Sequence, residues 1–210
     1  MVNLFKFIFF SILCCQNLFA RPISYTGGTT IIQNNGPVKH SLLIHYTPYY
    51  TYSIGYKWEH FRNDDINLNG IQINRLINRW HFMNAQGNLY LKTAFGDASK
   101  SNQHDVYGMI DLSGDYETEH LFTSYDAKYY QSNGDIIKQF QQVGRLGITP
   151  YVGDYGDLHT WLMLELSHQP TYSGDKLILT PLIRLFKGPR LVEFGYSSDN
   201  RLLFNWILRF

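Results

Sequence analysis

The stretch YTYSIGYKWE at residues 50–59 indicates the fold class of this chain. Its even positions, from Tyr50 to Trp58, are apolar or aromatic, and its odd positions, from Thr51 to Glu59, are small, polar or charged. A period of two sends successive side chains to opposite faces of a β-strand. The stretch therefore predicts a strand with one face in an apolar environment and the other in a polar one.

The same alternation recurs along the chain and is clearest in the last nine residues, LLFNWILRF at 202–210. Clusters of Gly, Asn, Asp and Ser, which favour turns, separate the alternating segments. Counting between these turns predicts about ten strands. They lie near residues 50–61, 66–79, 88–97, 104–116, 119–131, 138–151, 157–169, 175–187, 190–198 and 201–210.

Residues 41–49 leave the strand count open, because Leu42, Ile44 and Tyr46 continue the even apolar phase. They either extend the first strand or form a strand of their own. In the second case residues 27–33 supply a partner, and the count becomes twelve. We therefore divide the chain after its first 20 residues into a partly extended segment, 21–49, and a β-barrel domain, 50–210.

Residues 1–20 have the pattern of a secretory signal peptide. Lys6 supplies a positive charge, residues 7–15 form an apolar stretch, and Leu18-Phe19-Ala20 is an acceptable cleavage site. The apolar stretch is shorter than the roughly 20 residues that a membrane-spanning helix needs. Cleavage after Ala20 is therefore preferred to a membrane anchor.

Both cysteines of the chain, Cys14 and Cys15, fall within this predicted signal peptide. Lipidation at Cys14 is a minor alternative, because Leu13 precedes it where a lipoprotein signal has a small residue. If cleavage follows Ala20, the mature chain has no disulfide, no thiolate metal site and no cysteine nucleophile.

Composition excludes several classes of protein. The 18 Lys and Arg against 17 Asp and Glu give no basic excess for a nucleic-acid partner. With 44% hydrophobic and 17% charged residues the chain is too apolar to be disordered. Its mean hydropathy of −0.24 is not that of a helical membrane protein.

Alternating strands build either a membrane barrel or a soluble β-barrel of the periplasm, whose apolar face points inward. Tyr and Trp crowd the strand ends, where the interface of a membrane favours them, and closure removes sheet edges that lipid cannot solvate. We therefore expect a closed, antiparallel, up-and-down transmembrane β-barrel with its apolar face outward. The inner face then carries Lys57, Lys92, Lys128, Arg145, Arg184 and Arg209 opposite Glu59, Asp111, Asp115, Asp126, Glu165 and Glu193.

The last strand also carries a resemblance to a known group of proteins. Its alternating apolar residues, which finish on a terminal Phe, resemble the C-terminal strand by which Gram-negative outer-membrane barrels are recognised for assembly. The resemblance implies an assembly signal made of Phe204, Trp206, Leu208 and Phe210. Residues 146–161 and 180–186 are also similar to uncharacterised small barrels of Gram-negative bacteria, and that likeness implies no activity.

The chain offers few candidates for catalysis or metal binding. Its eight histidines lack the HExxH spacing of a zinc motif. Ser167 and His168 are the nearest match to the Ser–His pair of a lipid-modifying barrel enzyme, but adjacent strand residues point to opposite faces. Asp154, Asp157 and His159 could hold a divalent cation, although an ordinary turn is the favoured interpretation, as it is for Asp64-Asp65. We predict no catalytic residue, no metal and no cofactor, and we lean against an enzyme.

The predicted lumen is narrow and filled, because large inward side chains such as Tyr90, Trp161 and Phe186 accompany the balanced charges. We select Lys57, Glu59, Asp126, Arg145, Glu165, Arg184 and Glu193 as a lumen charge network. The expected role is structural or interaction-based, in the outer membrane after secretion to the periplasm. A narrow channel for small solutes or ions and a lipid-modifying enzyme are the alternatives. The expected partners are outer-membrane lipid and the barrel-assembly machinery, and the expected state is a monomer.

Overall fold

The computed structural model describes residues 23–154, 156–171 and 176–210, so the predicted signal peptide lies outside the described residues. The described chain forms twelve β-strands. They are β1 (Thr29–Asn35), β2 (Lys39–Tyr49), β3 (Tyr52–Phe61), β4 (Ile66–His81), β5 (Ala85–Lys100), β6 (Gln103–Thr118), β7 (Leu121–Ser132), β8 (Lys138–Ile148), β9 (His159–His168), β10 (Leu177–Lys187), β11 (Arg190–Tyr196) and β12 (Leu202–Arg209). No helix in the described residues is long and apolar enough to cross a membrane.

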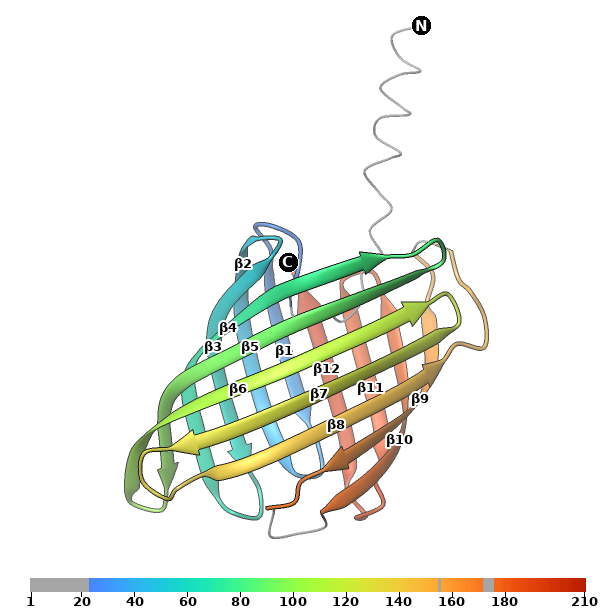
Figure 1. The fold of residues 1–210 in the computed structure, drawn as a ribbon. Helices are drawn as coiled ribbons and strands as arrows, with labels where there is room; N and C mark the ends of the chain where they lie inside the picture. Colours follow the sequence, from blue (N-terminus) through green and yellow to red (C-terminus); the bar gives the residue numbers. More distant parts are fainter. Residues whose placement is uncertain (1–22, 155, 172–175) are drawn as a thin grey trace, which may run out of the picture.

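Each strand pairs antiparallel with the strands before and after it, and β1 pairs with β12, so the sheet closes into an up-and-down barrel (Figure 1). Backbone hydrogen bonds in both directions join Thr29 to Phe210 at one rim. We call this the terminal rim. The opposite rim, which carries the turn at residues 36–38 between β1 and β2, is called the distal rim. The all-β, closed antiparallel barrel predicted from the sequence is confirmed.

The preferred count of ten strands is wrong, and the alternative of twelve is correct. The segment 21–49 contributes β1 and β2 to the barrel. The turn that separates β2 from β3 contains Tyr50 and Thr51 and none of the Gly, Asn or Asp residues that mark most of the other turns. Even-numbered residues also point outward on both sides of this turn, since Tyr46 and Tyr52 are both exposed. The alternation therefore does not reveal the turn, although the strand register shifts between Tyr46 and Tyr49.

The two faces of the barrel differ in chemistry. Inward positions hold nearly all the buried charged and polar side chains, whereas outward positions hold most of the exposed aliphatic and aromatic ones. On β9, for example, Leu162, Leu164 and Leu166 are exposed, and Glu165 between them is buried. The alternate positions that the sequence predicts to be apolar and outward are the ones that lie on the outside of the barrel.

Two glycines allow β4 and β5 to approach closely. Gly70 and Gly96 lie directly opposite each other in the register, and a Cβ at Gly96 would overlap the carbonyl oxygen of Asn69. We expect Gly96→Ala to lower the free energy of unfolding by more than the roughly 1–3 kcal/mol typical of overpacking, because backbone rather than a side chain must move. Denaturant unfolding in detergent micelles, followed by tryptophan fluorescence, measures this.

Gly108→Ala is the matched control, since a Cβ there meets nothing within 4 Å. It should leave the unfolding free energy within about 0.5 kcal/mol of the native value. Equal stability of the two variants would contradict the close pairing of β4 with β5.

Candidate functional site

The candidate site is the barrel interior, where six strands present the seven residues of the predicted charge network. Strand β3 carries Lys57 and Glu59, and each of the other members stands on a strand of its own. All of them are inward, and all line one cavity. The remaining members are Asp126 on β7, Arg145 on β8, Glu165 on β9, Arg184 on β10 and Glu193 on β11.

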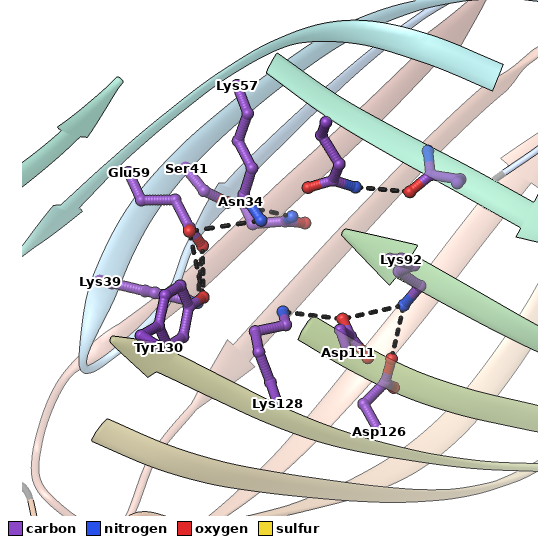
Figure 2. A network of polar contacts seen from close by, with 12 residues as sticks. Asn34, Lys39, Ser41, Lys57, Glu59, Lys92, Asp111, Asp126, Lys128 and Tyr130 are labelled. Atoms are coloured by element: carbon purple, nitrogen blue, oxygen red, sulfur yellow. Dashed lines mark hydrogen bonds and ion pairs between the residues drawn. The ribbon is translucent and has the colours of Figure 1, made fainter. Parts of the chain in front are cut away.

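The first ionic cluster is centred on Glu59. Its carboxylate accepts a hydrogen bond from Lys39 Nζ at 2.7 Å and lies 3.3 Å from Lys57 Nζ. The hydroxyl of Tyr130, from β7 on a distant part of the wall, donates to the same carboxylate at 3.0 Å (Figure 2). The Tyr130 ring packs edge-on against Phe61, with ring centroids 5.5 Å apart. This cluster ties β2, β3 and β7 together across the lumen.

The second cluster places two lysines beside one aspartate. Lys92 and Lys128 lie 3.3 and 3.2 Å from the same oxygen of Asp111, and both are its direct neighbours in the strand register. Lys92 also donates to Asp126 Oδ1 at 2.7 Å (Figure 2). Opposite charges on adjacent strands stabilise the pairing of those strands.

The third cluster surrounds Glu193. Its carboxylate accepts hydrogen bonds from Arg184 Nε and Asn205 Nδ2, each at 2.7 Å, and from Arg145 Nη1 at 3.2 Å. Arg145 Nε donates to Glu165 at 2.7 Å. Arg145 and Glu193 stand on β8 and β11, so this contact also crosses the lumen. Buried charges are tolerated when they are paired and hydrogen-bonded in this way.

Apolar clusters flank these charges. The first lies toward the distal rim and includes Phe61, Leu68, Tyr107 and Tyr130 from β3–β7 together with Ile178 from β10, so it crosses the lumen. The second runs along β9–β12 toward the terminal rim. It consists of Trp161, Met163, Leu182, Phe186, Leu191, Leu203 and Ile207, with Ile32 and Phe122 packed against it.

A third, smaller cluster joins Ile23, the first described residue, to Leu76 and Tyr90. Between the three clusters lies a cavity of about 320 Å³, which we call the chamber. Its volume is at the lower end of the roughly 300–1,000 Å³ of small-molecule sites. Members of all three ionic clusters line it. Large inward side chains occupy parts of the interior, as expected, and this chamber lies among them.

Sequence reasoning missed Lys39 and Tyr130 as partners of Glu59. Lys39 lies in the segment that was not assigned to the barrel, and Tyr130 has the inward parity but is distant in sequence. Arg209 is inward and buried, as expected, but it does not line the chamber. The predicted assembly residues occupy the outer face of β12, where Phe204 and Phe210 are exposed. Their role in assembly remains a prediction.

The alternative chemical candidates do not converge on a catalytic arrangement. Ser167 is buried in the lumen and accepts a hydrogen bond from Gln169, whereas His168 has the opposite parity. Asp157 accepts a hydrogen bond from the backbone of Asp154 at 3.1 Å, which is ordinary turn chemistry. Within the described residues, no group of three or more His, Cys, Asp or Glu side chains is arranged to hold a metal ion.

Glu193 is the acceptor on which the third cluster depends. Replacing it by Ala leaves the buried guanidinium of Arg184 without its carboxylate, so we expect the unfolding free energy to fall by about 3–5 kcal/mol. Denaturant titration in detergent micelles measures the loss.

Glu119→Ala, at an exposed turn, removes the same side chain without a buried partner and should change stability by less than about 0.5 kcal/mol. A Glu193→Ala variant as stable as Glu119→Ala would show that the cluster does not stabilise the barrel.

No protein-family model and no curated protein matches the sequence. Among solved structures, the chain is similar to the KdgM porin in complex with disordered oligogalacturonate, with 15% identity over 87% of this chain and 98% of that one and a TM-score of 0.49. It is also similar to the NanC porin, with 12% identity over 87% and 97% of the two chains and a TM-score of 0.43. A third similar structure is the translocator domain of the autotransporter NalP from Neisseria meningitidis, with 10% identity over 89% and 88% and a TM-score of 0.40.

Proposed function

We propose that this chain spans the outer membrane of a Gram-negative bacterium as a barrel with a filled, charge-balanced lumen, and that its role in the cell envelope is structural or interaction-based. The observation that supports this proposal is the inverted distribution of side chains. Aliphatic and aromatic residues cover the outside, and ion pairs fill the inside. Closure leaves no unpaired sheet edge, which the hydrocarbon core of a membrane requires.

The placement of aromatic residues supports a membrane interface near the terminal rim. Tyr49, Tyr50 and Tyr52 are exposed around the turn from β2 to β3, and Trp80 and Tyr116 are exposed toward the same rim on β4 and β6. Rings with one polar edge prefer the boundary between lipid and water.

The filled lumen argues against bulk diffusion. Open porins have 16–18 strands, whereas this barrel has twelve and carries apolar clusters toward both rims. A narrow channel for ions or small solutes is the second candidate function, and the charged chamber favours it. The lipid-modifying enzyme is the weaker alternative, because Ser167 and His168 are on opposite faces.

An outward leucine at mid-strand tests the membrane assignment. Leu164 is 43% exposed in the middle of β9, and we expect Leu164→Arg to lower barrel stability in lipid vesicles by about 2–4 kcal/mol, as a cation does near the bilayer midplane. Leu158→Arg is the control, because Leu158 is 47% exposed in the connection between β8 and β9. If neither variant is destabilised, the outer face meets water and the protein is a soluble barrel.

Fractionation and conductance test the location and the role. The full-length protein should appear in the outer-membrane fraction as a band whose gel mobility changes on boiling. Purified protein inserted into planar bilayers should show no large, steady conductance if the lumen is closed. Discrete small steps would favour the narrow channel, and a soluble periplasmic band would contradict both.

A further inference from the structure

The chamber wall carries equal numbers of positive and negative side chains. The two kinds are not equally exposed to the cavity. The wall contains six cations and six acids. They are Lys39, Lys57, Lys92, Lys128, Arg145 and Arg184, and Glu59, Asp111, Asp115, Asp126, Glu165 and Glu193.

Three of the cations have larger exposed side-chain fractions than the acids with which they pair. The side chains of Lys92, Lys128 and Arg145 are 15%, 19% and 22% exposed, and as inward residues of the wall they are exposed to the chamber. Their acidic partners lie beneath them, with Asp111 at 1%, Glu193 at 3% and Glu165 at 8%. Each of these three cations is therefore more exposed to the chamber than the acid beneath it.

Two acids keep access to the chamber. Asp126 is 30% exposed and accepts a hydrogen bond from Lys92, and the half-buried Asp115 accepts one from Asn88. Asp126 is thus an accessible negative charge next to Lys92, and it accepts a hydrogen bond from one N–H group of Lys92.

The lysines retain unused donors. Each ammonium has three N–H groups. Among the described residues, Asp111 is the ionic partner of Lys128, and it binds Lys92 through the same oxygen, so the two ammonium groups flank that oxygen (Figure 2). Two cationic donors that line the same chamber are suited to an anion with several oxygens.

We propose that the chamber is a binding site for a small oxyanion, a phosphate or carboxylate group, held by Lys92 and Lys128, with Arg145 on β8, the strand next to that of Lys128, as a further cation. Residues 36–38 line the chamber at the distal rim, so the site borders that mouth of the barrel. The proposal goes beyond the function proposed above. Anion binding requires the folded chamber, but it does not require that the barrel conduct ions.

Titration with inorganic phosphate tests the site. The barrel, refolded in uncharged detergent micelles and checked for heat-modifiable mobility, is titrated calorimetrically against phosphate at constant ionic strength set with chloride. We expect saturable binding with about one phosphate per barrel. Asp126→Asn should raise the affinity by about 3- to 10-fold, because it removes the accessible negative charge.

Lys128→Gln should weaken binding about tenfold or more, and the barrel should still fold because Asp111 keeps Lys92 as its partner. Lys138→Gln, an exposed lysine on the outer face of β8, should leave the affinity unchanged. Absence of saturable binding, or an affinity that moves with neither Asp126→Asn nor Lys128→Gln, would overturn the proposal. Since the assay uses micelles, neither result bears on membrane location.

Discussion

Closure of the sheet by β1 and β12 is the constraint on which the other features of this barrel depend. The register from Thr30–Arg209 to Asn35–Phe204, continued by the backbone pair of Thr29 and Phe210, satisfies the backbone groups that an open sheet would leave at its two edges. Closure also creates an inside and an outside. Only then does the alternation of side chains become a separation between a charged lumen and an apolar surface.

Within the closed barrel, the register determines which charges meet. Arg184 lies opposite Glu193, and Lys92 opposite Asp111, so much of the ionic network consists of neighbours on adjacent strands. Contacts such as that of Tyr130 with Glu59 then connect distant parts of the wall. Because both kinds of contact are buried, the network limits how far the wall can move while the charges remain paired.

The apolar clusters give the lumen its functional character. They occupy the regions toward the two rims and leave the charges around a chamber in between, so the interior is better suited to holding a small solute than to passing a large one. In that chamber the carboxylates of Asp111, Glu165 and Glu193 are less exposed than the cations Lys92, Lys128 and Arg145. A wall that is neutral overall can therefore present a positive surface to a solute.

The sequence by itself determined the fold class and the face on which each side chain lies, because a period of two is a local property of the strand. It selected seven charged residues for the inner face, all of which line the chamber, and it identified twelve strands as an alternative. It did not reveal the turn at Tyr50 and Thr51, because even-numbered residues point outward both before and after that turn. Nor did it reveal that Lys39 and Tyr130 converge on Glu59, because those contacts join residues 20 and 71 positions apart. Only the tertiary structure decided which charges meet, how deeply each is buried and where the chamber lies, since pairing register and closure are properties of the whole barrel.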